Sequence, residues 1–205
     1  MNRTADVVIV GAGVIGSATA FELAKRGYKT LNIDKLPASG YGSTSNSCAI
    51  VRAHYSTWDG VAMAYEGFFY WDDWNKYLEV EDERGMAKYM KTGSIMFMLK
   101  GADHSKKSLN LFKEIGVEHE IWDLETLKKK MPIYSHDSYN GTSRPDEDDS
   151  FFDKSGDQIE GAVWTPGSGY VSDPQLATHN LQICLLYTSD AADDTPCVDL
   201  GGRRI

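Results

Sequence analysis

The hydrophobic pattern of the first 34 residues predicts a strand, a helix and a second strand. Residues 6–10 form a short run dominated by β-branched apolar side chains, which is typical of a strand buried on both faces of a parallel sheet. A glycine-rich turn follows, and helical spacing of apolar positions then continues to Gly27, a residue suited to the left-handed end of a helix. Residues 30–34 repeat the strand pattern. This order predicts a parallel α/β unit at the start of the chain.

The pattern beyond residue 38 changes to shorter elements separated by turns. Residues 39–47 are rich in glycine and serine without periodicity, which predicts a loop. The elements expected after it are an amphipathic helix over 59–78, a strand pair over 89–99 broken at Gly93, helices over 105–115 and 123–131, an acidic hairpin tip or loop over 145–157, a strand over 162–165 and a helix opening at Asp173-Pro174. The aromatic stripe of the 59–78 helix (Val61, Ala62, Tyr65, Phe68 and Phe69) is interpreted as core rather than as cofactor contacts.

Composition and charge narrow the class of protein. With 41% hydrophobic and 25% charged residues, the 205-residue chain has the balance of a soluble globular protein. No apolar run reaches the roughly 20 residues of a membrane-spanning helix. A net charge of -9 argues against a nucleic-acid partner, because phosphate binding needs clustered Lys and Arg. The cysteines at positions 48, 184 and 197 match no metal-ligand or redox spacing, so we expect no metal site and a reducing compartment, the cytoplasm.

Residues 184–205 differ in character from the rest of the chain. They resemble the translation of a transposase-type sequencing adapter in two blocks, over 184–194 and 198–205. We therefore expect a non-native tail rather than a C-terminal loop, with the native sequence cut off near Ile183. Cys48 is then the one native cysteine, and we expect it to be buried and inert.

The sequence Gly11-x-Gly13-x-x-Gly16 lies between the first expected strand and the expected helix. A lone motif of this kind is a weak signal, but here an acid, Asp34, also closes the next strand. In this context Gly11 permits the tight turn, Gly13 lets the backbone approach a pyrophosphate, and Gly16 allows the helix to pack closely on the strand. The helix N-terminus offers N–H groups to the phosphates, and Asp34 accepts from ribose hydroxyls. The motif predicts binding of the ADP part of a dinucleotide, against the alternative of a glycine turn without a ligand.

Further segments extend this pattern. They are Ala20, Leu23, Ala24 and Gly27 on the helix, Gly42-Ser43-Thr44-Ser45, Ile50-Val51-Arg52, Thr92-Gly93-Ser94-Ile95 and the stretch from Gly169 to Pro174. With them the chain resembles the D-amino-acid oxidase superfamily of flavoproteins, and within it the relatives of sarcosine oxidase, glycine oxidase and dimethylglycine dehydrogenase. The resemblance covers residues 6 to about 181 and is strongest over the first 55.

The resemblance implies a fold and a division into domains. The implied fold class is α/β, with a Rossmann-like FAD-binding domain of the glutathione-reductase type and the beginning of an antiparallel-sheet substrate domain. Residues 1–87 and 160–183 would form an incomplete FAD-binding domain, and residues 88–159 part of the substrate domain. The implied cofactor is FAD.

Roles for individual residues are implied in the same way. Arg52 would hold the substrate carboxylate with its forked guanidinium, and its alternative role is a structural ion pair. His54 and Tyr55 are expected to be structural. Asn46 stands where dimethylglycine dehydrogenases carry a flavin-attaching histidine, so covalent attachment there is not expected. The expected cofactor-binding residues are Gly11, Ala12, Gly13, Val14, Ile15, Gly16, Asp34, Lys35, Gly42, Ser43, Thr44 and Ser45.

The reaction implied by the resemblance is oxidation of the C–N bond of a small secondary or tertiary amine or an amino acid, with hydride transfer to flavin N5. Oxygen, a quinone or an electron-transfer protein would then accept the electrons. The alternatives are a flavin-linked hydroxyacid or glycerophosphate dehydrogenase, an NAD-dependent dehydrogenase and a non-catalytic fragment; the second Gly-Ser loop at 42–45 disfavours the nicotinamide enzyme. Because the family completes its flavin pocket after position 200, we expect this chain alone to be inactive.

Overall fold

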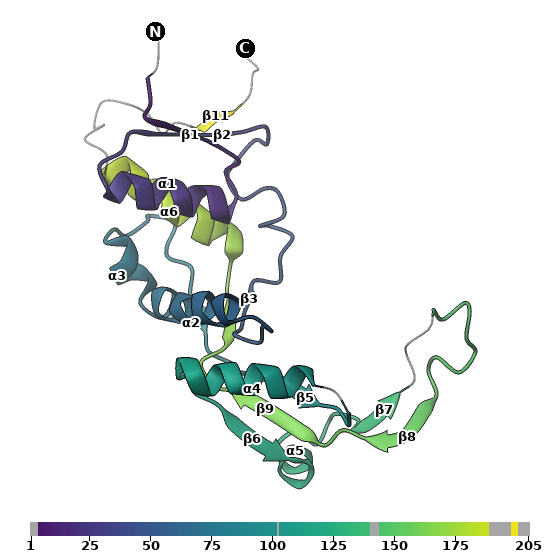
Figure 1. Ribbon diagram of the computed structural model, residues 1–205. Helices are drawn as coiled ribbons and strands as arrows, with labels where there is room; N and C mark the ends of the chain where they lie inside the picture. The colour runs from purple at the N-terminus through teal and green to yellow at the C-terminus, as the bar shows by residue number, and fades with distance from the viewer. Residues whose placement is uncertain (1–3, 102, 140–143, 189–197, 201–205) are drawn as a thin grey trace. The chain divides into compact units, whose positions relative to one another are not determined.

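The first strand, helix and second strand form where the sequence predicts them. The computed structural model describes residues 4–101, 103–139, 144–188 and 198–200, which pack into two units. The first unit comprises the described residues of 1–51, 69–90 and 170–205, and the second comprises those of 52–68 and 91–169. Figure 1 labels the helices and strands of both.

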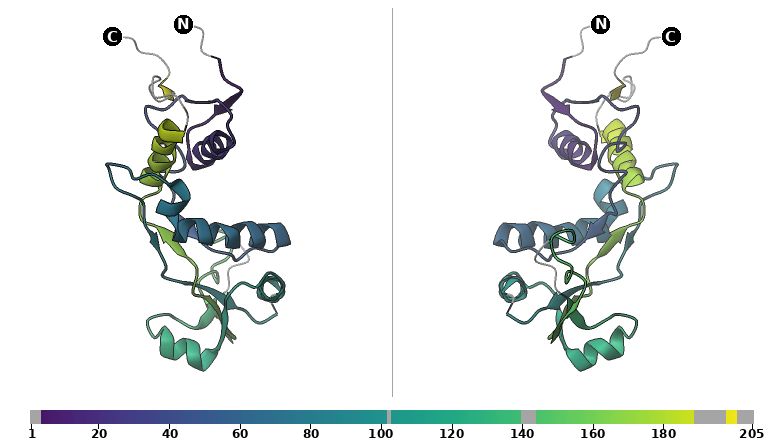
Figure 2. Two further views of the ribbon diagram at one scale, coloured as in Figure 1. Left: turned by 90° about the vertical axis from the view of Figure 1, so that its left-hand side faces the viewer. Right: turned by 90° about the vertical axis from the view of Figure 1, so that its right-hand side faces the viewer.

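A parallel sheet opens the first unit. Strands β1 (Val7–Val10), β2 (Thr30–Asp34) and β11 (Val198–Leu200) lie in the order β1-β2-β11, and both neighbouring pairs are parallel. Helix α1 (Val14–Lys25) joins β1 to β2, and it lies beside α6 (Pro174–Thr188) in all views (Figures 1 and 2). The predicted parallel α/β unit is therefore confirmed.

The burial expected for β1 is wrong on one face. Val7 and Ile9 are half-buried, but the alternate side chains Val8 and Val10 are exposed, Val10 to 83%. Successive side chains of a strand point to opposite faces, and α1 packs against one face of the sheet. An apolar run thus marks the strand correctly without fixing how many of its faces are covered.

The helix expected over 59–78 is two helices, α2 (Trp58–Asp72) and α3 (Trp74–Leu78). The break falls at Asp73, whose backbone leaves the helical region. Trp74 then enters the core of the first unit, where its indole N–H donates to Asn180 Oδ1 at 3.3 Å. Two aspartates at the C-terminal end of α2 also oppose its dipole, which favours ending the helix there. The aromatic stripe is core at Val61 and Phe68, whereas Phe69 is exposed.

The strand pair expected over 89–99 forms as two strands that do not pair with each other. Strand β4 (Tyr89–Met90) pairs with β10 (Gly169–Val171) in a small sheet of order β3-β10-β4, where β3 is Ile50–Val51. Strand β5 (Ser94–Met98) instead pairs with β9 (Gly161–Thr165). Gly93 separates them with a φ of +71° and donates its N–H to Ser168 O, so the chain turns between two sheets.

An antiparallel sheet organises the second unit. Its order is β5-β9-β6, with β6 at Glu120–Asp123, and α4 (His104–Ile115) and α5 (Leu124–Lys130) pack beside it. Asp123 caps α5 by accepting from Thr126 N, and Gly116 ends α4 in the left-handed region, as the sequence predicts. A hairpin of β7 (Asp137–Tyr139) and β8 (Lys154–Gln158) brackets the acidic segment.

A buried polar network ties α6 to the loop that follows α3. Asn180 is fully buried; its amide nitrogen donates to Asp82 Oδ2 and Gly85 O, and its oxygen accepts from Ala87 N as well as from Trp74. Burial opposes the charge of Asp82, but the Arg84 N–H and the side chains of His179 and Asn180 outweigh it and lower the pKa of this carboxyl. Because every polar group of Asn180 has a partner, the network holds the loop in one conformation.

Asn180→Ala should lower the free energy of unfolding by about 3 kcal/mol, since it leaves several buried polar groups without partners. Asn75→Ala, at an exposed position on α3, is the matched control and should change it by less than about 0.5 kcal/mol. Urea unfolding followed by tryptophan fluorescence measures both. Equal effects of the two substitutions would contradict this role for the network.

Candidate functional site

The glycine turn joins β1 to α1 at the edge of the parallel sheet. Gly11 has a φ of +109° and donates its N–H to Ile33 O at 2.7 Å, which extends the pairing with β2 by one residue. Gly13 is extended and forms the N-cap of α1. A Cβ atom at Gly16 would lie 1.9 Å from Gly11 O, so only glycine permits this approach of the helix to the end of the strand. The packing role expected for Gly16 is what the geometry shows.

Asp34 points back at the turn from the tip of β2. Its Oδ2 accepts from Ala12 N at 2.7 Å, and its Oδ1 accepts from Leu36 N at 2.9 Å. These N–H groups, Ala12 first, lower the pKa of the carboxyl, so it is ionised at neutral pH. The carboxylate keeps further lone pairs, which can accept from hydroxyl groups of a ligand.

The N-terminus of α1 is bordered by a second loop. Thr44 is buried, and its Oγ1 accepts from Val14 N at 3.1 Å; Gly40 N donates to Ala12 O at 2.8 Å. The N–H groups of residues 13, 15 and 16 have no hydrogen-bond partner among the residues that the structure describes. They lie at the positive end of the helix dipole, which is the arrangement that binds phosphate.

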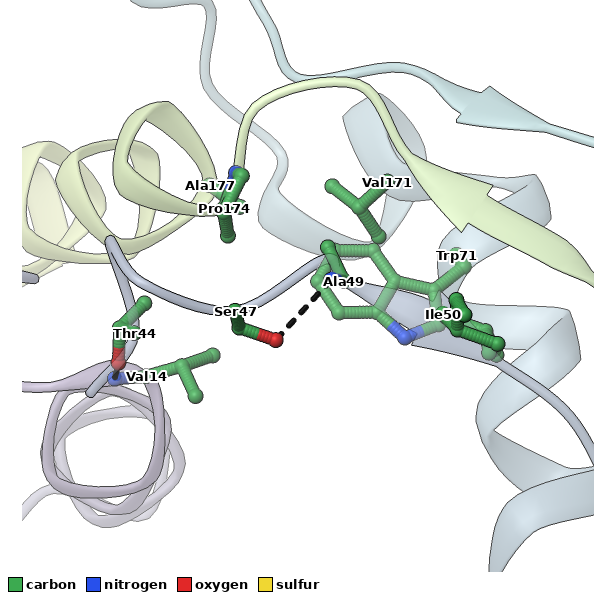
Figure 3. A pocket seen from close by; sticks show the side chains of 10 residues that line it. Val14, Thr44, Ser47, Ala49, Ile50, Trp71, Val171, Pro174 and Ala177 are labelled. Atoms are coloured by element: carbon green, nitrogen blue, oxygen red, sulfur yellow. Dashed lines mark hydrogen bonds between the residues drawn. The ribbon is translucent and has the colours of Figure 1, made fainter.

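An apolar cavity of about 170 Å³ adjoins this helix terminus. Figure 3 shows Val14 and Thr44 at one side of it and Trp71, Ile50 and Val171 at the other. Ser47 also lines it, but its hydroxyl accepts from Ala49 N at 3.0 Å. The first unit therefore sets phosphate-binding amides next to an apolar cavity, which suits a ligand with a pyrophosphate and an aromatic ring system.

The remaining predicted contacts are less well placed. Ser43 and Lys35 are exposed, and the Ser45 hydroxyl donates to Gly42 O within its own loop rather than to the turn.

Cys48 is exposed, so the expectation that it is buried is wrong. It lies in a surface loop next to Ala49, a non-glycine residue with a φ of +52°, and no packed element covers it.

Arg52 lies in the second unit, on the extended segment after β3. It is exposed, its guanidinium lies 5.8 Å from the centre of the Tyr55 ring, and it forms no ion pair with any carboxylate in the described part of the chain. The alternative of a structural ion pair thus finds no support among these residues. The cation is available to an anionic ligand.

His54 is buried two residues further on. Its Nε2 makes a short hydrogen bond to Thr165 Oγ1 and lies 3.4 Å from Ser94 Oγ, while its ring packs on Phe112 with 5.7 Å between centroids. Burial, and then the charges of Arg52 and His104, lower its pKa to about 4. His54 is therefore neutral at physiological pH and has the structural role expected for it.

The stability of the second unit should fall as the pH drops from about 6.5 to about 4. In this window the unfolded chain binds a proton at His54 and the folded chain does not, so stability is full above pH 6.5 and is lost by at most about 1.4 kcal/mol per pH unit below it. Urea midpoints at several pH values measure this slope. His54→Gln should flatten the dependence of stability on pH, and His119→Gln is the control in which another histidine is lost. An unchanged slope in His54→Gln would contradict the conclusion that His54 stays neutral in the folded chain.

Sequence reasoning missed three contributors to the site. Gly40 lies in the predicted loop and Trp71 in a predicted helix, but only the folded chain brings them to the turn and the cavity. Asn32 is the third: its side chain donates to Gly11 O at 2.9 Å. A polar residue in the middle of an apolar strand was the signal for it.

No helix in the described ranges is long and apolar enough to cross a bilayer.

A parallel β-α-β unit with free amides at the helix terminus and a carboxylate at the second strand defines a dinucleotide-binding α/β protein. The chain belongs to the family of FAD-dependent oxidoreductases, DAO, which matches residues 6–199. This confirms the resemblance, the fold class and the cofactor, FAD, expected from the sequence. The domain boundaries and the non-native tail stay predictions; α6 continues through Cys184, which is buried in the core of the first unit.

Curated relatives point to one part of this family. The chain is 31% identical over 147 residues to a putative sarcosine oxidase of Caenorhabditis elegans, with 71% of this chain and 36% of that protein covered. It is 29% identical over 149 residues to monomeric sarcosine oxidase of Bacillus sp. (strain B-0618), with 71% and 37% covered. The chain therefore spans little more than a third of the length of these relatives.

Solved structures agree on the fold. L-proline dehydrogenase from P. horikoshii superposes with a TM-score of 0.69 at 20% identity, covering 92% of this chain and 43% of that one. Glycine oxidase from Geobacillus kaustophilus superposes with a TM-score of 0.64 at 22% identity, covering 90% and 45%. These similarities concern the architecture alone.

Proposed function

We propose that the whole protein oxidises the C–N bond of a small secondary or tertiary amine or an amino acid, with FAD as the hydride acceptor. The observation that carries the proposal is the glycine turn, where unpartnered amides of α1, the Asp34 carboxylate and an apolar cavity lie together in a member of an FAD-dependent family. The similar proteins are named for sarcosine, glycine and L-proline. Each of these three compounds has a carboxylate next to a carbon that carries an amine.

The residues of the first unit would hold the cofactor. The N–H groups of residues 13, 15 and 16 donate to the pyrophosphate, helped by the dipole of α1, and Asp34 accepts from the ribose hydroxyls. Thr44 caps the helix and keeps these amides in place. Bound FAD would supply the acceptor for the substrate hydride. The apolar cavity beside Trp71 would offer an apolar lining to an aromatic part of the cofactor.

Arg52 would bind the substrate through its carboxylate. Its guanidinium is exposed and stands beside the Tyr55 ring, which limits its rotation while leaving the planar fork free to make two parallel hydrogen bonds. In the proposed reaction the protein would orient the substrate and the cofactor would accept the hydride.

Charge substitutions at Ile15 test the cofactor site without touching the core, because this first-turn side chain of α1 is 82% exposed. Ile15→Glu should weaken FAD binding about fivefold by repulsion of the pyrophosphate, and Ile15→Lys should leave it unchanged or strengthen it. Titration of FAD fluorescence with each purified chain measures the affinity. Both variants should unfold at the same urea concentration within error, since a surface change of this kind costs little. Equal FAD affinities for the two would contradict binding at this turn.

Arg52→Met tests the substrate site. In the whole protein, the concentration of the amino acid sarcosine that gives half-maximal bleaching of bound FAD without oxygen should rise at least about tenfold, whereas that for dimethylamine, which lacks a carboxylate, should stay the same. Arg84→Met, at an exposed arginine of the first unit, is the control. Bleaching by glycerophosphate instead of amines would favour the alcohol-oxidising alternative. In this chain alone, binding of FAD without bleaching by any compound would support the expectation that these residues alone are inactive.

A further inference from the structure

One peptide group of the glycine turn is held at both ends by neighbouring side chains of β2. The carbonyl of Gly11 accepts from Asn32 Nδ2 at 2.9 Å, and the N–H of Ala12 donates to Asp34 Oδ2 at 2.7 Å. This C=O and this N–H belong to the same peptide plane. Asn32 and Asp34 are two residues apart on a strand, so their side chains leave the same face. The strand thus fixes the rotation of the Gly11–Ala12 peptide.

That rotation decides where the next amides point. Gly11 and Gly13 flank Ala12, and glycine leaves the backbone free to rotate, so the turn itself does not set the orientation. The Gly11 carbonyl also lies between Asn32 Nδ2 and Gly16, whose ideal Cβ position is 1.9 Å from the oxygen and 3.5 Å from the amide nitrogen. Turning the peptide over would bring its oxygen against the Asp34 carboxylate. The hydrogen bonds from β2 therefore hold the orientation of the peptide that the structure has, in which the N–H groups of residues 13, 15 and 16 have no partner among the described residues.

Asn32 is not explained by the stability of the sheet. It is 5% exposed, it sits between Leu31 and Ile33, and its Oδ1 is buried without a hydrogen-bond partner among the described residues. The amide cannot be turned to satisfy that oxygen, because the carbonyl groups of Ile9 and Gly11 face its nitrogen. A buried acceptor left unpaired lowers the stability of the folded chain, and an apolar side chain carries no such acceptor.

We propose that Asn32 is a positioning residue of the dinucleotide site, acting through the Gly11–Ala12 peptide. It orients the amides that receive the pyrophosphate, while its own Oδ1 stays buried without a partner among the described residues. The link to affinity rests on the proposed function. The restraint on the Gly11–Ala12 peptide does not rest on the proposed function, because its two hydrogen bonds are present in the chain without FAD.

Asn32→Leu separates positioning from stability. The variant removes the unpaired Oδ1 but also takes the amide donor away from the Gly11 carbonyl, so its urea midpoint should stay close to that of the parent chain. In the free chain its Ala12 N–H should exchange with deuterium at least about tenfold faster, since the peptide can rotate away from Asp34. Its FAD dissociation constant should rise about tenfold, the loss expected when one hydrogen bond no longer orients the site. The second buried asparagine, Asn180, supplies the matched control: Asn180→Ala lowers stability but should change neither the Ala12 exchange rate nor the FAD affinity.

Each outcome decides one part of the inference. Lower stability of Asn32→Leu with unchanged Ala12 exchange and unchanged FAD affinity would make Asn32 an ordinary core residue and overturn the proposal. Faster Ala12 exchange with unchanged FAD affinity would confirm the hold on the peptide and overturn its role in binding. A parent chain that binds no FAD refutes the proposed function, and the exchange rate of the free chain still decides whether Asn32 holds the peptide.

Discussion

The contact between Gly16 and the carbonyl of Gly11 is the constraint on which the rest of the site depends. Because no Cβ intervenes, α1 begins against the last peptide of β1 and directs its first N–H groups away from the sheet. The same approach brings the turn within reach of β2, whose Asp34 and Asn32 hold it by its N–H and its C=O. At the same helix terminus, Thr44 Oγ1 accepts a hydrogen bond from Val14 N. Strand, helix and loop therefore converge on one set of amides.

The elements that could be predicted from the sequence are those fixed by short-range chemistry. Strand 30–34, the helix ends at Gly27 and Gly116 and the cap at Asp173 follow from backbone preferences within a few residues. The errors concern long-range partners. The break at Asp73 follows from the place of Trp74 in a core built with α6, and the partner of β5 is β9, about 70 residues away. The spacing of hydrophobic residues indicates neither the helix break nor the strand partner.

The candidate site divides in the same way. The glycine spacing and Asp34 were found from the sequence because their roles are backbone geometry and a fixed position on the neighbouring strand. The exposure of Cys48 could not be predicted from the sequence, because it depends on whether another element covers the loop. The part played by Asn32 was also missed, because a single polar residue in an apolar strand has many explanations until its partner, the Gly11 carbonyl, is known.

The electrostatics of the site reconcile an acidic chain with a diphosphate ligand. A net charge of -9 repels the ligand at long range, but salt screens such fields beyond about 8 Å at physiological ionic strength. At contact the donors are neutral backbone amides, which need no lysine and add no charge to be neutralised when the site is empty. The Asp34 carboxylate beside the turn already accepts from two N–H groups, which partly offset its charge. In the proposed site, recognition of phosphate would depend on the orientation of peptides rather than on charge, and so a peptide free to rotate would weaken it more than the loss of a surface cation.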